Sequence, residues 1–489
     1  MLTLIYGFKT AFRIPLIKLI RGIFVFLRPF ELSGHCELTK NIYSSIAARE
    51  RENLMSKEYP ELHLSSDQAA LLGIDFKEIC RLALGNKIIR VTADITDDGG
   101  ESLTTITPEL SLALNLPEGW EFNLRQDGDK LRIGPLVAIM TDAYHPKRAS
   151  FGSQDSFFRG LLSSMNQLNG WAYVFTPQDI NWQKNRIYGY YLLSPRRNWQ
   201  RAWFPFPDVC YNRYFKHSST VPANTPVSMA RLQGRVKTFN SHIGTKIKVH
   251  RQLAQEPDIA AHLPDTRLFS SVGQLSSMLN KYRAVYIKPV NGSQGQGIAK
   301  VNKINRGYSV KTSSASKEFK HESLAEIMKM IRSASPGKQL IIQQAIRVSG
   351  QPHFDFRLLI QRDLRGHWSV TGIAARIGTK ATITTNLHTG GHAVSLPKVL
   401  ESRGFGAQQI ATIQQEMEGL ALRIAKTIAK SARLIGELGL DFMVDHRGKV
   451  WFLEANPKPA RASFAQIDKD LRSQTIARPM EFAYYLAGF

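Results

Sequence analysis

The chain has 489 residues, a length that accommodates roughly two to four domains. Hydrophobic residues make up 43% of the chain and charged residues 21%, which excludes a wholly disordered protein. No uncharged apolar run reaches the ~18 residues of a membrane-spanning helix, so a polytopic membrane protein is excluded as well. The three cysteines lie far apart and form no CxxC pair, which excludes a disulfide scaffold and a zinc finger and fits a reducing cytosol.

The net charge is the unusual feature of the composition, because 64 Lys and Arg residues against 40 Asp and Glu residues give +24. Such a chain attracts polyanions, whether these are nucleotides, nucleic acid, anionic lipid or an acidic polymer. The sequence has no zinc finger, no basic-zipper heptads and no aromatic RNA-binding signature. Nucleic acid is therefore a weak candidate among these partners.

Residues 1–30 carry five basic residues and no acid among many apolar residues. The charges interrupt the apolar stretch and no A-x-A site follows, so a secretory signal is not expected. Two interpretations stay open. The segment is either an interfacial helix on an anionic membrane surface or a terminal helix packed on the body of the protein.

Residues 31–133 are predicted to form a strand-rich N-terminal domain. The alternating apolar run over 86–95 predicts a strand, and a turn is expected at 97–100. The stretches 64–74 and 106–119 look alike, which fits either a weak internal duplication or two ordinary helices capped by Ser or Thr. Nothing in this region indicates chemistry.

Residues 134–235 are predicted to form an α/β domain, because continuous apolar runs alternate with a stretch of helical spacing. Ligands of such sheets bind beyond the carboxyl ends of the strands. Tyr211, Asn212 and Arg213 follow the last apolar run and are therefore candidate ligand contacts. A solvated loop is the alternative for each of them.

A glycine-rich loop at 292–297 follows the apolar strand that ends at Lys288. Glycines allow backbone N–H groups to wrap a phosphate chain, although structural turns have the same composition. The spacing fits neither a P-loop, nor the dinucleotide fingerprint, nor a protein kinase. A nucleotide phosphate would offset the charge of Lys288 at the mouth of the loop, and an exposed strand end is the alternative.

Asp441, Glu454 and Asn456 form the strongest constellation, because they lie on the two strands of a predicted β-hairpin. Glu454 and Asn456 are two residues apart and project from one face, and a hairpin can bring Asp441 alongside them. Three oxygen ligands on one face suit Mg²⁺, and the apolar setting makes an uncompensated carboxylate costly. The alternative is a surface hairpin whose polar side chains are hydrogen-bonded and bind no metal.

Three further groups complete the predicted site, and one of them is Asn386 beside the Gly390-Gly391 loop, a candidate cover for phosphate or substrate. Gln343 and Gln344 follow an apolar strand and could contact the edge of adenine, with Ile346 as an apolar wall. Arg357 and Arg376 lie in neighbouring predicted strands, where their guanidinium groups could clamp phosphate or a developing oxyanion.

The motifs YIKPVNGSQGQGI, IIQQAI, FDFRLLIQ, AARIG, TNLHTGG and LDFMVD…VWFLEANPKP occur in the order of the ATP-grasp superfamily. With GPLVAIMTD, YNR, FNSHIGTK and LPDTRLFS, the sequence resembles the YheC/YheD family of endospore coat-associated ATP-grasp proteins over roughly residues 60–485. The resemblance implies an α/β (α+β) chain with an ATP-grasp fold at its C-terminal end. The expected segments are a basic amphipathic segment (1–30), a strand-rich domain (31–133), a small α/β pre-ATP-grasp domain (134–235) and the ATP-grasp domain (236–489).

The resemblance also implies roles for individual residues. The residues expected to bind ATP are Lys246, Lys288, Gly292, Ser293, Gln294, Gly295, Gly297, Gln343, Gln344 and Ile346. The expected magnesium ligands are Asp441, Glu454 and Asn456, and the expected catalytic residues are Arg376, Asn386 and Arg357, with Asp355 orienting Arg357. Position 344 departs from the family, because Gln stands where many ATP-grasp enzymes have Glu. Gln remains compatible with amide-type contacts to adenine.

The implied activity is that of a Mg-ATP-dependent ligase, with Mn²⁺ as an alternative metal, which activates a carboxylate as an acyl-phosphate and transfers it to an amine or a thiol. A kinase on the same fold and a non-catalytic, ATP-binding coat-assembly protein are the alternatives. The expected partners are ATP and an unidentified carboxylate and amine or thiol, with an anionic membrane surface or spore coat proteins as further options. The expected location is cytoplasmic, with peripheral membrane or spore coat association as alternatives.

Overall fold

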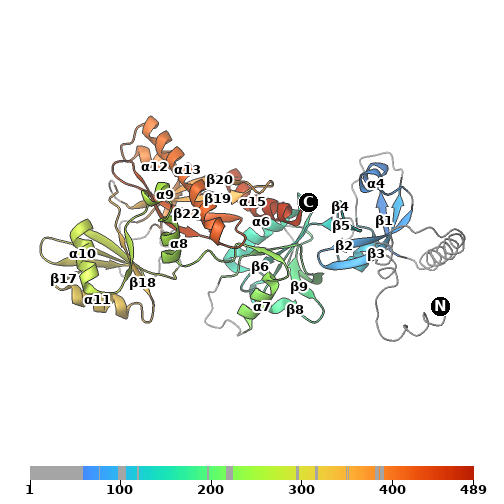
Figure 1. Ribbon diagram of the computed structural model, residues 1–489, viewed down its shortest axis with the longest axis horizontal. Coiled ribbons are helices and arrows are strands. Elements are labelled where there is room, and N and C mark those ends of the chain that lie inside the picture. Colours follow the sequence, from blue (N-terminus) through green and yellow to red (C-terminus); the bar gives the residue numbers. More distant parts are fainter. Residues whose placement is uncertain are drawn as a thin grey trace, which may run out of the picture. The chain divides into compact units, whose positions relative to one another are not determined.

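The computed structural model describes residues 59–489, apart from several short segments (Figure 1). The gaps are 76, 97–105, 118–119, 195–197, 216–223, 293–296, 314–317, 349, 351, 380–384 and 386–389. The basic N-terminal segment, the turn expected at 97–100, Ser293, Gln294, Gly295 and Asn386 therefore lie outside the described residues. Residues 60–489 form one compact unit. Within the described part of the chain, no helix is long and apolar enough to cross a membrane.

The first sheet of this unit has the strand order β1-β3-β2-β5-β4. Its elements are β1 (Glu61–Leu64), α4 (Ser66–Leu72), β2 (Glu78–Leu84), β3 (Lys87–Ile95), α5 (Pro108–Leu114), β4 (Asn123–Asp127) and β5 (Lys130–Gly134). The strand expected near 86–95 is confirmed as β3. Ser65 and Thr107 cap α4 and α5 by accepting backbone N–H groups, so the two similar stretches are helices with ordinary N-caps.

The second sheet combines parallel and antiparallel strands, in the order β10-β9-β7-β6-β11-β12 with β8 paired to β9. Its strands are β6 (Leu136–Met140), β7 (Trp171–Phe175), β8 (Ile180–Asn181), β9 (Arg186–Tyr191), β10 (Gln200–Pro205), β11 (Val209–Asn212) and β12 (Lys237–Phe239). The helical segments are η1 (Pro146–Arg148), η2 (Gly152–Gln154), α6 (Asp155–Asn166), η3 (Pro177–Asp179) and α7 (Thr225–Gln233). β7, β6, β11 and β12 are parallel, and every residue of β6, β7 and β11 is buried, which confirms the buried strands that the apolar runs of β6 and β7 predicted.

The third sheet is antiparallel throughout, with the order β13-β18-β14-β15-β16-β17. Its elements are β13 (Thr266–Phe269), α10 (Val272–Tyr282), β14 (Ala284–Pro289), β15 (Ala299–Lys303), β16 (Tyr308–Thr312), β17 (Phe319–His321), α11 (Leu324–Ser333) and β18 (Leu340–Gln344). Helices α10 and α11 cover one face, where Val285 and Ile287 join their apolar core (Figure 1). The alternate residues of β14, Tyr286 and Lys288, therefore project from the opposite face.

The fourth sheet carries the predicted hairpin and has the order β21-β20-β19-β22-β23. Its strands are β19 (Phe354–Arg362), β20 (Trp368–Ile377), β21 (His392–Val394), β22 (Glu437–Val444) and β23 (Val450–Asn456). The accompanying helices are α8 (Lys246–Leu253), α9 (Pro257–Ala260), α12 (Leu396–Glu401), α13 (Ala407–Ser431), α14 (Ala462–Ala465) and α15 (Lys469–Ala487). Apolar residues recur at helical spacing over 408–432, which predicts a helix there; α13 is that helix, and it packs its apolar stripe on this sheet. α15 contacts β19, β20 and also α6 beside the second sheet.

The buried stripe of α13 gives a direct test of this packing. Ile424 is fully buried in the core between α13 and the fourth sheet. Ile424→Ala should lower the free energy of unfolding by about 2–5 kcal/mol, because it removes buried methyl groups and leaves a cavity. Urea denaturation measures the change, with Lys426→Ala on the exposed side of the same helix as the control. A loss no larger than that of the control would contradict this packing.

Candidate active site

The β22–β23 hairpin brings the three expected metal ligands together. Asp441 pairs directly with Glu454, and Asn456 pairs with Gly439 two positions along the strand. The Asn456 amide nitrogen lies 3.5 Å from a carboxylate oxygen of Asp441 and 3.4 Å from one of Glu454. The structure therefore places two carboxylates and one amide on one face, and turning the Asn456 amide over would present its oxygen to a cation there.

This donor set fits a hard divalent cation. Two carboxylates and an amide oxygen are the ligands that Mg²⁺ or Mn²⁺ takes from a protein, with phosphate oxygens and water completing the coordination. Asp441 is buried and Glu454 is half-buried, so a bound cation would also offset charge that water solvates poorly.

Two lysines approach the same hairpin from other elements. Lys246 is the first residue of α8, and its Nζ lies 2.8 Å from Oε2 of Glu454. Lys288 projects from β14, and its Nζ donates to Oε1 of Gln343 at 2.7 Å. Burial lowers the pKa of Lys288 to about 8, and the charge of Lys246 adds to this while Glu454 opposes it. Burial acts to raise the pKa of Glu454, but the two lysines hold it below its usual range.

Arg357 of β19 is bound to the hairpin by a bidentate ion pair. Its Nε and Nη2 donate to the two carboxylate oxygens of Asp441 at 2.6 and 3.1 Å. The guanidinium stem lies close to the backbone of β22, since a Cβ built on Gly439 would come within 3.3 Å of Arg357 Cδ and 2.9 Å of Pro459 Cβ. A glycine is therefore needed at position 439 for this approach.

Arg376 of β20 joins the same group of charges. It donates to both oxygens of Asp355 at 2.7 Å, and its Nη2 lies 3.3 Å from Oδ1 of Asp441. Burial acts to lower the pKa of Arg376, but the two carboxylates raise it above its usual value. Thr385 donates to Asp355 at 2.6 Å. The expectation that Asp355 orients Arg357 is wrong, because the strand register sets Asp355 opposite Arg376 and Arg357 opposite Asp441.

The structure separates the three residues expected to hold adenine. Gln343 faces Lys288 and donates to Thr266 Oγ1 at 3.0 Å. Adjacent residues of a strand face opposite sides, so Gln344 faces away, and its Oε1 accepts the backbone N–H of Asp265 at 3.3 Å. A pocket of about 240 Å³ lies at this end of β18. It is lined by Lys281, Tyr282, Gln344, Ala345, Ile346, Arg347, Asp445, His446 and Trp451.

A row of polar side chains beside Lys288 was not predicted from the sequence. Tyr286 pairs across the strands with Lys300, and Lys300 pairs with Lys311. The Nζ atoms of Lys288 and Lys300 lie 5.4 and 5.6 Å from the centre of the Tyr286 ring. The two-residue alternation within AVYIK and AKVNK is the signal that would have found them.

The two described ends of the glycine-rich loop are Gly292 and Gly297. Gly297 has a φ of +70°, and a Cβ there would lie 3.1 Å from Pro289 Cγ, so this turn requires glycine. The next residue, Ile298, donates its N–H to Ser313 Oγ at 3.2 Å. The loop therefore leaves the sheet close to Lys288 and rejoins it through a fixed turn.

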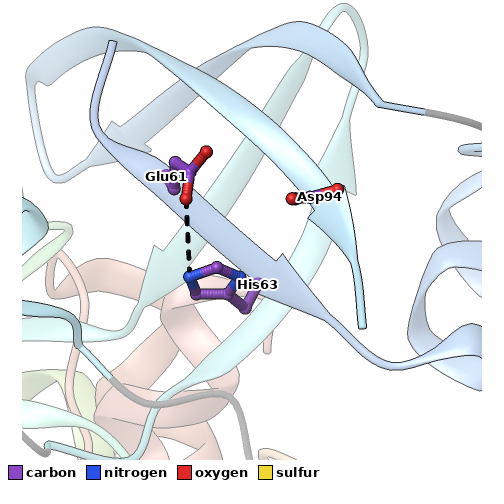
Figure 2. A group of neighbouring side chains, drawn as sticks. All are labelled: Glu61, His63 and Asp94. Carbon is purple, nitrogen blue, oxygen red and sulfur yellow. Dashed lines mark ion pairs between the residues drawn. The ribbon is translucent and has the colours of Figure 1, made fainter. Parts of the chain in front are cut away.

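A second group of titratable residues lies on the first sheet, away from the hairpin. Figure 2 shows Glu61, His63 and Asp94, with His63 3.8 Å from Glu61. The Nζ of Lys77 lies 3.0 Å from Glu61 and 3.1 Å from Asp94, so its charge offsets both carboxylates. We interpret the group as a surface cluster of ion pairs.

Three features together define the ATP-grasp class of proteins. They are the antiparallel third sheet, the fourth sheet backed by the long helix α13, and the cations around the carboxylates of the β22–β23 hairpin. Residues 235–486 match the family described as YheC/D like ATP-grasp, and the chain belongs to this family. The predicted family and the predicted α/β fold class are thereby confirmed.

Two relatives from Bacillus subtilis (strain 168) are similar over most of the chain. The endospore coat-associated protein YheD is 30% identical over 398 residues, which cover 79% of this chain and 86% of YheD. The endospore coat-associated protein YheC is 24% identical over 322 residues, which cover 64% of this chain and 87% of YheC.

Two solved structures are also similar. D-cycloserine synthetase DcsG has a TM-score of 0.42 at 14% identity, covering 71% of this chain and 99% of that chain. VanG D-Ala:D-Ser ligase from Enterococcus faecalis has a TM-score of 0.44 at 11% identity, covering 72% of this chain and 99% of that chain.

The environment of His353 predicts a pH dependence of stability. Burial, and then the charges of Lys300, Lys311 and Arg403, lower the pKa of His353 from 6.5 to about 4. The unfolded chain therefore takes up a proton at a higher pH than the folded chain does. As the pH falls from 6.5 towards 4, His353 therefore lowers the free energy of unfolding. The decrease is roughly 1–2 kcal/mol, because the ring is partly exposed and water screens its charge.

His353→Gln should reduce this loss, because it removes the group that is protonated only on unfolding. Urea denaturation at about pH 7 and about pH 5 measures the difference. The exposed His367→Gln is the matched control. If both variants lose as much stability as the wild type between these two pH values, the assignment to His353 is wrong.

Proposed function

We propose that the protein is a Mg-ATP-dependent ligase that joins a carboxylate to an amine or a thiol through an acyl-phosphate. The observation that carries this proposal is the position of Arg376, whose Nη2 lies 3.3 Å from Asp441 while Asp355 fixes its guanidinium. A rigid guanidinium beside metal ligands is suited to stabilise the negative charge that develops in acyl transfer.

The hairpin residues Asp441, Glu454 and Asn456 would hold Mg²⁺, with Mn²⁺ as the alternative. Bound there, the cation would neutralise charge on the phosphate oxygens of ATP. Lys246 and Lys288 supply two more positive charges from α8 and β14 on the same side of the hairpin. We assign both lysines to the phosphates of ATP.

The remaining expected contacts complete the nucleotide site. We assign the loop of Gly292, Ser293, Gln294, Gly295 and Gly297 to the triphosphate, because it begins close to Lys288. Gln343 lies beside Lys288, while Gln344 and Ile346 line the pocket at the end of β18. We assign adenine to this strand end, with backbone and amide groups reading its edge.

The proposed reaction has two steps. An oxygen of the substrate carboxylate attacks the γ-phosphorus, the bond to the β–γ bridging oxygen breaks, and ADP leaves from an acyl-phosphate. An amine or thiolate then attacks the carbonyl carbon, and the tetrahedral adduct releases inorganic phosphate. An attacking amine loses its proton to the departing phosphate or to water. Arg376, with Arg357 and Asn386, would stabilise the charged intermediates, so positioning and electrostatics supply the rate.

A kinase and a non-catalytic ATP-binding protein remain the competing proposals. A kinase would use the same ATP contacts but would transfer phosphate to a hydroxyl, so the phosphate would remain on the product. A ligase releases it. The names of the two relatives associate them with the endospore coat. We therefore propose that the reaction of this protein contributes to formation of the spore coat or envelope.

The first test concerns ATP binding. Lys288→Ala should weaken Mg-ATP binding by roughly tenfold to a hundredfold, because it removes a charge-assisted contact of ~1.5–3 kcal/mol. Isothermal titration measures the affinity, with the exposed Lys338→Ala as the control. An affinity equal to that of the control would sink the assignment of Lys288.

The second test concerns turnover. Glu454→Gln keeps size but removes a charge from the metal site, so turnover should fall more than ATP affinity. Arg376→Ala should still bind ATP but stall at the step that makes or consumes the acyl-phosphate. Phosphate release, with hydroxylamine to trap an acyl-phosphate as a hydroxamate, measures turnover beside direct ATP titration. Wild-type turnover in both variants would favour the non-catalytic alternative.

A further inference from the structure

Arg213 and Lys458 bring positive charge to the place where the second sheet meets the hairpin. Arg213 follows β11, whose neighbours β6 and β12 are parallel to it, so it lies beyond the carboxyl ends of parallel strands. Lys458 lies two residues after Asn456 at the end of β23. The Nζ of Lys458 donates to the backbone oxygen of Tyr214, and Asn240 donates to the backbone oxygen of Pro457 at 2.8 Å.

The guanidinium of Arg213 is buried among Tyr211, Phe157 and Phe215, and its N–H groups have few good acceptors. Only 4% of the residue is exposed, and its Nε has no acceptor within the described part of the chain. Its Nη1 lies 3.4 Å from the Pro459 oxygen and its Nη2 3.5 Å from Gln154 Oε1, both long for hydrogen bonds. A guanidinium has five N–H donors, and a buried one normally finds acceptors for them.

The nearest carboxylate does not correct this deficit. Glu437 Oε1 lies 3.7 Å from Arg213 Nη1, beyond hydrogen-bonding distance. Glu437 already accepts hydrogen bonds from Tyr211, from Gln361 at 2.9 Å and from Arg461. Arg213 therefore shares an anion whose oxygens are committed elsewhere.

Lys458 has a similar shortage of acidic partners. Its hydrogen bond goes to the backbone oxygen of Tyr214, and among the described residues no carboxylate lies within 4.0 Å of its Nζ, so Asp142 acts on it only from a longer distance. The ring of Phe215 lies 5.0 Å from the Arg213 guanidinium and 5.6 Å from the Lys458 ammonium. Two cations thus flank one aromatic ring, and both lack a full anionic partner.

From this arrangement we infer that Arg213 and Lys458 bind an anionic group of the acid that is activated at the hairpin, so that this substrate carries a second carboxylate. Two residues of chain span at most ~7 Å between Cα atoms, so the backbone of Lys458 lies close to Asn456, while its side chain reaches towards Tyr214 beside Arg213. The substrate class is then a dicarboxylic acid, an acidic amino acid or an acidic peptide. This inference rests on the proposed function and deepens it.

The test compares diacids with their monoamides on the full chain with Mg-ADP. The probes are glutarate against its monoamide, L-glutamate against L-glutamine, and an acidic tripeptide against its amide. Isothermal titration should show that the diacids bind roughly tenfold more tightly than their monoamides. This is the difference in affinity expected because each monoamide lacks one charge-assisted contact. Lys458→Gln should remove this preference, and Lys458→Arg should retain it.

Two further variants support the comparison. Arg213→Lys keeps the charge but loses the planar guanidinium, and it should weaken diacid binding without unfolding the chain, as denaturation would verify. Lys449→Gln, an exposed lysine in the turn of the same hairpin, is the control and should change nothing. Equal affinity for diacids and monoamides, no binding of any diacid, or a preference that survives Lys458→Gln would overturn the inference.

The outcome is separable from that of the proposed function. If diacids bind through Lys458 but no acid yields a hydroxamate with Mg-ATP and hydroxylamine, the subsite is retained and the ligase activity is rejected. If monoacids yield hydroxamate at the same rate in Lys458→Gln and wild type, the ligase activity is retained and the subsite is rejected.

Discussion

The opposition of two carboxylates across the β22–β23 hairpin is the constraint on which the rest of the site depends. The register sets Asp441 directly opposite Glu454, and two such charges are costly at this spacing unless cations offset them. The cations come from three other elements: Lys246 from α8, Arg357 from β19 and Arg376 from β20. One local pairing therefore ties together segments that are far apart in the sequence.

The hairpin residues could be predicted because the information for them is local. A short turn and the two-residue period of a strand were enough to bring Asp441 and Glu454 together. The partners of the arginines depend instead on the register between strands that are distant in sequence. Asp355 meets Arg376 and Arg357 meets Asp441 only because β19 pairs with both β20 and β22 in one particular alignment. No spacing within a single motif records that alignment.

The elements of the fold that depend on local sequence patterns could be predicted, and the packing between distant elements could not. Continuous apolar runs identified the buried strands of the second sheet, and helical spacing identified α13 almost to the residue. The packing of the C-terminal helix α15 against the second sheet could not be foreseen. It depends on contacts such as that of Phe482 with Phe239, whose rings lie 5.4 Å apart and which are separated by most of the ATP-grasp domain.

The fully buried Glu437 has a consequence for how the protein can move. It accepts hydrogen bonds from Tyr211 of the second sheet and from Gln361 of the fourth sheet. Pulling these sheets apart would leave a buried carboxylate short of partners, at a cost of about 3–5 kcal/mol. The second and fourth sheets are therefore expected to behave as one rigid body. If nucleotide binds as proposed, we expect its admission to depend on movement of the third sheet, whose Lys288 forms no ion pair with the hairpin among the described residues.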